Sequence, residues 1–152
     1  MFSNNGLCKK VLVRCSGRPF EVSYTGEKIV AVTIWDNHEV VFVNVITNTI
    51  TNTVDIGYLC YETDFNMNRL AIRVIQSPTS SHIVYLDHQG KLIDRVNIPG
   101  MNSTNLSLRD DTINCTDSVT NKVYCYTLTG QQIWMDLQRP KRLTRTKGNC
   151  LR

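Results

Sequence analysis

Catalysis by side chains requires a nucleophile beside an oriented base, or two carboxyl groups that meet in a pocket. The sequence offers one adjacent acidic pair, Asp110 and Asp111, and neighbouring residues in a loop before a strand usually face water. Asp36, Asp87 and Asp117 lie at or just after the ends of apolar runs, where aspartate commonly closes turns by bonding its own backbone. We therefore expect no catalytic residue and no enzyme activity in this chain.

Six cysteines and three histidines supply the side chains from which metal sites and disulfides are made. No two cysteines are arranged as Cys-x-x-Cys and no histidine stands at ligand spacing beside them, so we expect neither a metal nor another cofactor. Their even number would allow three disulfides in an oxidising compartment, but we expect several to be small buried residues in strands. The residues are Cys8, Cys15, Cys60, Cys115, Cys125, Cys150, His38, His82 and His88.

Basic side chains are concentrated at the C-terminal end of the sequence. Residues 139–152 contain six of the 17 cations and no acid, which leaves 11 basic and 13 acidic side chains in residues 1–138. The body of the chain is therefore mildly acidic, whereas the basic segment would attract RNA. RNA binding is an alternative function, although the segment lacks aromatic side chains for base stacking. The candidate contacts are Arg139, Lys141, Arg142, Arg145 and Lys147.

The sequence shows no targeting signal and no membrane span. The N-terminal residues lack an apolar stretch of about 7 to 15 residues, and no window approaches about 18 apolar residues. We expect a cytoplasmic protein without membrane contact. The triplets 102–104, 105–107 and 114–116 match the N-glycosylation acceptor pattern, so a secreted glycoprotein is a second alternative.

A repeat of about 40 residues runs along the chain and decides the expected fold. The segments 28–34, 69–75 and 112–118 superpose by pattern at offsets of 41 and 43 residues. A second set, 39–44, 82–87 and 122–127, superposes at offsets of 43 and 40 residues. The two sets agree, and both are rich in Val, Ile, Tyr and Thr between Asn, Asp, Gly and Ser, which is typical of strands and tight turns.

Each repeat contains four expected strands, and no window has the apolar period of a helix. The further strands are 19–24, 50–55, 58–61, 91–96, 104–108 and 132–135, with hairpin glycines at Gly90 and Gly130. Four antiparallel strands in each period predict an all-β partial propeller of about three blades, with a β-sandwich as the structural alternative. We expect one domain over 1–152: an outer strand at about 8–15, blades at about 18–56, 57–98 and 102–136, and the start of a further blade at 137–152.

Three phrases of the sequence resemble a known family. They are 123–134, 18–24 running into 28–35, and 139–144 followed by 147–149. Together they are similar to the C-terminal NHL-type propellers of tripartite-motif (TRIM) proteins, above all the variety expanded in invertebrates such as molluscs. The resemblance covers nearly the whole chain.

The resemblance implies a protein-binding or scaffold role like that of the substrate-recognition propeller of TRIM-like ubiquitin ligases. The RING finger, B-box and coiled coil of that family are absent here, so ligase chemistry is not implied. Family propellers close with about six blades, which implies that roughly half a ring is missing. We therefore expect marginal stability or self-association through the open blade edges.

Loop residues are the best candidates for partner contacts, because a propeller presents its interstrand loops on its two faces. The candidates are Arg18, Asn37, His38, Tyr58, Asn66, Ser77 and Arg109. Trp35 and Trp134 could be exposed anchors for a partner, because aromatic residues concentrate at interface hot spots. We expect the aromatic residues of the apolar strands to pack in the core instead, namely Trp35, Trp134, Tyr24, Tyr58, Tyr61 and Tyr85.

If the basic segment binds RNA, affinity will fall steeply as salt rises, because binding releases counterions from the phosphates. Titration of a labelled single-stranded RNA at two salt concentrations measures this. A binding constant that does not change with salt would contradict an electrostatic RNA site.

Overall fold

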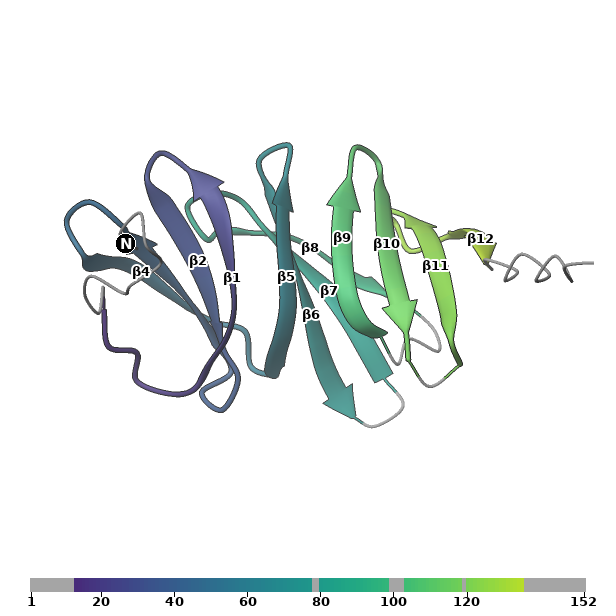
Figure 1. The fold of residues 1–152 in the computed structure, drawn as a ribbon, viewed down its shortest axis with the longest axis horizontal. Helices are drawn as coiled ribbons and strands as arrows, with labels where there is room; N and C mark the ends of the chain where they lie inside the picture. The colour runs from purple at the N-terminus through teal and green to yellow at the C-terminus, as the bar shows by residue number, and fades with distance from the viewer. Residues whose placement is uncertain (1–12, 78–79, 99–102, 119, 136–152) are drawn as a thin grey trace, which may run out of the picture.

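The computed structural model describes residues 13–77, 80–98, 103–118 and 120–135, and this part of the chain contains strands and turns but no helix (Figure 1). Accordingly, no described helix could span a membrane. The first sheet has β1 (Pro19–Gly26), β2 (Ile29–Ile34), β3 (Glu39–Asn44) and β4 (Thr49–Asp55). The second has β5 (Leu59–Asn66), β6 (Arg69–Ser77), β7 (Ser80–Leu86) and β8 (Leu92–Asn97). The third has β9 (Ser103–Arg109), β10 (Thr112–Asp117), β11 (Lys122–Thr127) and β12 (Gln132–Met135).

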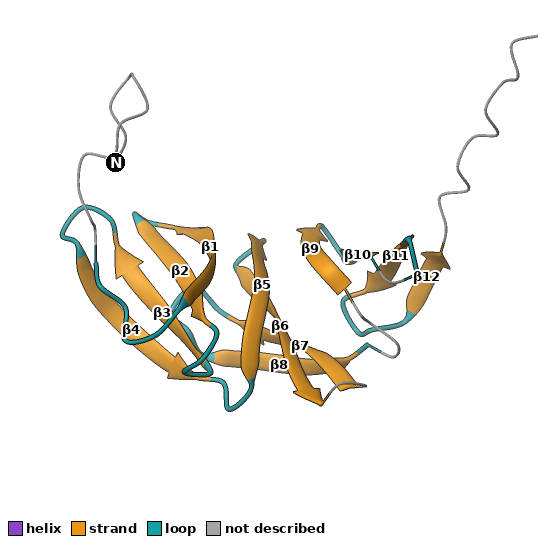
Figure 2. Cartoon of the chain, turned by 60° about the horizontal axis from the view of Figure 1, so that its bottom comes forward, coloured by secondary structure: helices purple, strands orange, loops and turns teal. Residues whose placement is uncertain are grey.

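Each sheet is antiparallel, and its strands are ordered as they occur in the chain. The three sheets follow one another along an arc, with β1, β5 and β9 on its concave side (Figure 2). We call these three the inner strands. The prediction of an all-β partial propeller with about three four-stranded blades is confirmed. A sandwich is excluded, because three sheets succeed one another around an arc.

The expected ends of the domain lie largely outside the described residues. Residues 13–15 are the described part of the expected outer strand 8–15, and they are not in a strand. The expected further blade at 137–152 lies wholly outside the described residues.

The predicted repeat is misaligned by one residue in the first sheet, as the hairpin turns between the first two strands of each sheet show. Ile29, Arg69 and Thr112 are each the first residue after this turn, because they pair with the last residues of β1, β5 and β9. The offsets are therefore 40 and 43, and the predicted alignment of Lys28 with Arg69 is wrong. The error matters because successive side chains of a strand point to opposite faces.

In the second and third sheets a glycine closes the hairpin between the third and fourth strands, as predicted. Gly90 and Gly130 have φ of 86° and 84°, a conformation that other residues rarely adopt. A Cβ on Gly90 would also lie 2.7 Å from a methyl carbon of Val54 in the preceding sheet. A Cβ on Gly130 would lie 2.6 Å from Val96 in the same way. Both glycines thus allow a turn to pass close to its neighbouring sheet.

The core consists of two layers of side chains between successive sheets. The first layer joins Ala31, Val40 and Phe42 of the first sheet to Leu70 and Ile72 of the second. The second layer joins the other face of the second sheet to the third, with Ala71, Ile83, Tyr85, Leu108, Ile113 and Tyr126. The second sheet is therefore covered on both faces.

The described cysteines are free thiols, and two of them, Cys60 and Cys115, belong to these layers. Cys60, Cys115 and Cys125 are buried, as expected of small apolar residues in strands, and Cys15 is half-buried. Burial raises the pKa of the Cys60 thiol to about 12. Among the described residues, no three His, Cys, Asp or Glu side chains gather closely enough to hold a metal ion.

The inner strands are joined by hydrogen bonds from backbone to carboxylate. Glu21 Oε2 on β1 accepts the N–H of Thr63 on β5 at 2.7 Å, and Asp64 Oδ2 on β5 accepts the N–H of Leu108 on β9 at 2.8 Å. Ser23 Oγ adds a bond to the carbonyl oxygen of Thr63 at 2.9 Å. Burial raises the pKa of Glu21, although the bond from Thr63 opposes this shift. These bonds fix the height of each blade relative to the next.

Truncation of Phe42 tests whether the first core layer holds the blades together. Phe42 is 1% exposed, so we expect Phe42→Ala to lower the free energy of unfolding by about 3–5 kcal/mol. Ile46→Ala is the matched control, because Ile46 is 58% exposed and its loss should cost less than about 0.5 kcal/mol. Urea unfolding followed by circular dichroism measures both. Equal stability of the two variants would contradict this core.

Candidate functional site

The strand connections alternate between two rims of the arc, and this alternation sorts the predicted partner-binding residues. We call the rim with the β2–β3, β4–β5 and β6–β7 connections the lower rim, as oriented in Figure 1, and the opposite one the upper rim. Arg18, Asn37, His38, Tyr58 and Ser77 lie at the lower rim, whereas Asn66 and Arg109 lie at the upper rim. The structure thus brings five of the seven to one rim.

An aromatic cluster lies at the lower rim between the first two sheets. The ring of Tyr61 on β5 meets Phe20 of β1 edge to face, with centroids 5.3 Å apart. It also meets Trp35, which directly follows β2, edge to face at 6.5 Å. Phe20 is 52% exposed, while Trp35 and Tyr61 are half-buried. We call Phe20, Trp35 and Tyr61 the rim aromatic cluster.

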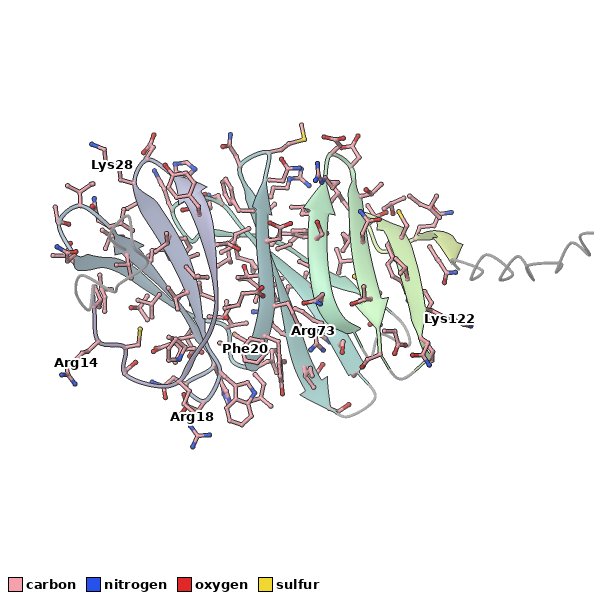
Figure 3. All side chains as sticks on the ribbon, viewed as in Figure 1. Arg14, Arg18, Phe20, Lys28, Arg73 and Lys122 are labelled. Carbon is pink, nitrogen blue, oxygen red and sulfur yellow. The ribbon has the colours of Figure 1, made fainter. Side chains whose placement is uncertain are left out.

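Arg18 covers the outer side of this cluster. Its guanidinium lies 5.9 Å from the centroid of Trp35, and its side chain is 78% exposed (Figure 3). Its backbone N–H donates to Asp36 Oδ1 at 2.7 Å, and its carbonyl oxygen accepts the N–H of Trp35 at 3.0 Å. Nε of Arg18 lies 3.6 Å from Asp36 Oδ2, an exposed ion pair that contributes little energy. The backbone bonds therefore hold Arg18 in place, and its charged group stays accessible.

A buried ion pair supports the cluster from within. Arg73 on β6 donates through Nε to Glu62 Oε2 and through a terminal nitrogen to Oε1 at 3.3 Å, and both side chains are 6% exposed. The guanidinium of Arg73 also lies 4.7 Å from the ring centroid of Tyr61. Two parallel bonds to one carboxylate fix the plane of the guanidinium. The pair thereby fixes the ring of Tyr61, which stands over it.

The expectation that the strand aromatics belong to the core is wrong for several of them. Tyr85 is 1% exposed and lies in the core as predicted, but Tyr24 is 62% exposed. Tyr58 is half-buried and packs against the first core layer, as predicted, whereas Trp35 and Tyr61 are half-buried at the lower rim. The side chain of Trp134 lies outside the described residues. Composition does not separate strand ends from strand centres, so the sequence pattern did not predict the cluster. The position of Trp35 directly before a turn is the signal that could have found it.

The other predicted residues serve partly in local structure. Asn37 donates to Ser16 Oγ at 2.9 Å, and the carbonyl oxygen of His38 accepts from Ile56 at 2.8 Å. Tyr58 lies under Arg95 at 5.9 Å, and Asn66 donates to the carbonyl oxygen of Leu108 in the third sheet at 3.3 Å. Ser77 and Arg109 end their strands, half-buried and exposed respectively. Arg139, Lys141, Arg142, Arg145 and Lys147 lie outside the described residues.

The acidic residues considered for catalysis occupy turns. Asp110 and Asp111 form the β9–β10 turn and are exposed. Asp87 accepts the N–H groups of Gln89 and Lys91, and the bond from Lys91 is the main cause of its lowered pKa. Asp117 accepts the N–H of Thr120 at 3.0 Å. The turn-closing roles of Asp87 and Asp117 follow the prediction, whereas Asp36 bonds the backbone of Arg18 instead.

The upper rim carries a pocket of about 320 Å³ between the first two sheets. Its lining includes Thr25, Glu27, Phe42, Asn52 and His88. Its lip is closed by a hydrogen bond from Asn52 to the carbonyl oxygen of Gln89 at 2.7 Å. It contains no cysteine or serine nucleophile, so we place the candidate site at the lower rim.

Removal of one member of the buried ion pair should be costly. We expect Arg73→Met to lower the free energy of unfolding by about 3–5 kcal/mol, because Glu62 is left as an uncompensated buried charge. The double variant Glu62→Leu with Arg73→Met should recover most of this loss, since no charge then remains. Urea unfolding of the three proteins measures the cycle. A double variant less stable than the single one would show that the pair is not the reason.

Comparison with known proteins finds the fold and no family. No family model matches the chain, and no curated protein matches it in sequence. Among solved structures, U3-55K is similar with a TM-score of 0.66 and 9% identity over 84% of this chain and 42% of that one. Hydrazine synthase of Kuenenia stuttgartiensis has a TM-score of 0.64 and 13% identity over 86% of this chain and 39% of that one. Sqt1 of Saccharomyces cerevisiae has a TM-score of 0.62 and 14% identity over 80% of this chain and 35% of Sqt1. The chain spans about a third to a half of the structures it matches, and its fold is that of part of a β-propeller.

Proposed function

We propose that this chain is a non-catalytic protein-binding module that holds its partner at the lower rim. The observation that carries the proposal is the rim aromatic cluster together with Arg18. Tryptophan, tyrosine and arginine are the residues that dominate binding energy at protein interfaces. Here they form one patch with an exposed phenyl ring and an exposed guanidinium.

The patch is ordered before any partner arrives. Tyr61 is held between Phe20 and the Arg73–Glu62 pair, and Trp35 is tied to Arg18 through its backbone. Side chains that are already fixed lose little conformational entropy on binding. This supports a recognition role, because an unsupported surface aromatic would lose part of its binding energy in becoming ordered.

The fold does not by itself decide between binding and catalysis. Two of the similar structures are named as enzymes, hydrazine synthase and the glutaminyl cyclase of Myxococcus xanthus, and propellers carry many unrelated functions. The proposal of a non-catalytic module therefore rests on the aromatic rings and the arginine of the lower rim, which are the side chains typical of protein interfaces.

The finer assignment is a TRIM-like protein with an NHL-type propeller that recognises substrates in the cytoplasm. Its support is the three sequence phrases given above, and no family model adds to them. The adjoining coding sequence tests it: a RING finger and B-box upstream are expected, and a different upstream domain would contradict the assignment.

Substitution of Trp35 tests the binding patch. Proteins captured by the wild-type chain are identified first, and their dissociation constants are then measured by calorimetry. We expect Trp35→Ala to weaken the binding of a true partner by at least about 2 kcal/mol, which raises the dissociation constant roughly thirtyfold. Arg18→Ala should raise the dissociation constant less. Circular dichroism confirms that each variant folds.

Ile46→Ala is the control for this experiment, because Ile46 is 58% exposed at the upper rim. It should bind as the wild type does. Partners that bind Trp35→Ala and Phe20→Ala with unchanged affinity would place the binding surface elsewhere.

A further inference from the structure

The first inner strand exposes three large apolar side chains. Phe20, Val22 and Tyr24 on β1 are 52%, 60% and 62% exposed. They alternate with Glu21, Ser23 and Thr25, whose side chains point toward the second sheet or are buried. Val22 and Tyr24 therefore lie on the face of the first sheet that looks away from the second, and we call these two the apolar strip, whereas Phe20 contacts Tyr61 of β5.

The same positions are covered in the other two sheets. Val22 pairs with Val32 and Thr63 pairs with Ile72, so Val22 and Thr63 occupy equivalent positions in the first and second sheets. In the same way, Tyr24 pairs with Val30 and Leu108 pairs with Ile113, so Tyr24 and Leu108 are equivalent in the first and third sheets. Thr63 is 5% exposed and Leu108 is 4% exposed. Each is covered by the inner strand of the preceding sheet. Within the described part of the chain no sheet covers the strip on β1, which is thus an open blade-packing surface.

The third sheet presents the opposite half of this joint. Ser107 on β9 corresponds to Ser23 and Asp64, since the three pair with Asn114, Ala31 and Ala71. Ser23 and Asp64 both bond the backbone of the next inner strand, whereas Ser107 is exposed.

Arg109, two residues further along β9, also has an equivalent residue that bonds the next inner strand. It corresponds to Asn66, which donates to the carbonyl oxygen of Leu108. The exposed face of β9 therefore carries donors at two positions, and each of these positions holds a donor in one of the two internal joints.

We propose that β1 of one chain docks on β9 of a second copy, so that two copies close one ring. The internal joints β1–β5 and β5–β9 are the template for this contact. In the closed ring, Ser107 donates to the carbonyl oxygen of Val22 of the second copy, as Ser23 does to Thr63. Arg109 donates to the carbonyl oxygen of Tyr24, as Asn66 does to Leu108. A two-fold axis repeats the joint, so no apolar strip remains open.

The number of blades selects two copies. Closed propellers have about four to eight blades. The described residues of one chain form three four-stranded sheets, so two copies supply six such sheets, within this range, and three copies supply nine, beyond it.

The described residues before β1 pack on another part of this face. Val13 and Cys15 pack on Ile34, Val41 and Val43, which belong to β2 and β3 of the same face. They do not cover the strip on β1. Between sheets, the inner strands form the most extensive contacts within this chain, so the joint needs chiefly β1 and β9.

Light scattering after size exclusion tests the ring with the 152-residue chain. We expect a mass of twice 17.4 kDa that does not grow with concentration. Val22→Asp should raise the dissociation constant at least about a hundredfold, because it places a carboxylate in both joints. Ile46→Asp changes an equally exposed side chain outside the joint and should remain dimeric. A monomer at all concentrations, or assemblies that keep growing, would overturn the proposal.

Cysteine trapping identifies the contact itself. Val22→Cys and Ser107→Cys in one chain should give an oxidised dimer on a non-reducing gel, absent from both single variants. Mass spectrometry should find a peptide containing residue 22 joined to one containing residue 107. A dimer without this link would show that another surface is used and would overturn the ring. The partner-binding variants at Trp35 leave this readout unchanged, so the two proposals fail separately.

Discussion

A four-stranded sheet has two faces, and in this protein the apolar faces between successive sheets are buried by one another along the arc. The second sheet meets this requirement on both sides, with Phe42 and Leu70 in one layer and Ile83 and Ile113 in the other. Stability is therefore shared between neighbours, as in other repeat architectures. Glu21 and Asp64 add direction to this packing, because each accepts a backbone N–H from the following inner strand. Apolar packing alone would tolerate sliding of one sheet along another, and these bonds do not.

The candidate binding surface is a product of the same joint. Tyr61 belongs to the second sheet and Trp35 to the connection after a strand of the first, so their contact exists only once the two sheets are packed. The buried Arg73–Glu62 pair lies within the second sheet and fixes the ring of Tyr61. Burial of two charges is costly and is compensated only by their mutual bonds. The pair is therefore better understood as a device that positions an aromatic ring than as a source of stability.

The strands, their number and their grouping were predictable because alternation and turn residues are local properties. Glu39–Asn44 and Lys122–Thr127 were predicted with the bounds that the structure shows. The alignment of Lys28 with Arg69 failed by one residue, since both segments are apolar at most positions and the pattern does not reveal which side chain faces which sheet. For the site, Arg18 was predicted, whereas Trp35 and Tyr61 were assigned to the core. Aromatic residues suit a core and an interface equally well, so composition could not separate the two.

The sequence by itself determined that the chain is all β, that it repeats with a period of about 40 residues, and that its first inner strand alternates apolar and polar side chains. These features are set by residues near one another in the chain. Only the tertiary structure decided which apolar side chains are covered. Leu108 and Tyr24 occupy equivalent positions, yet one is 4% and the other 62% exposed, because a sheet precedes β9 and none of the described residues forms one before β1. Burial depends on a neighbour about 40 residues away, and no local pattern contains that information.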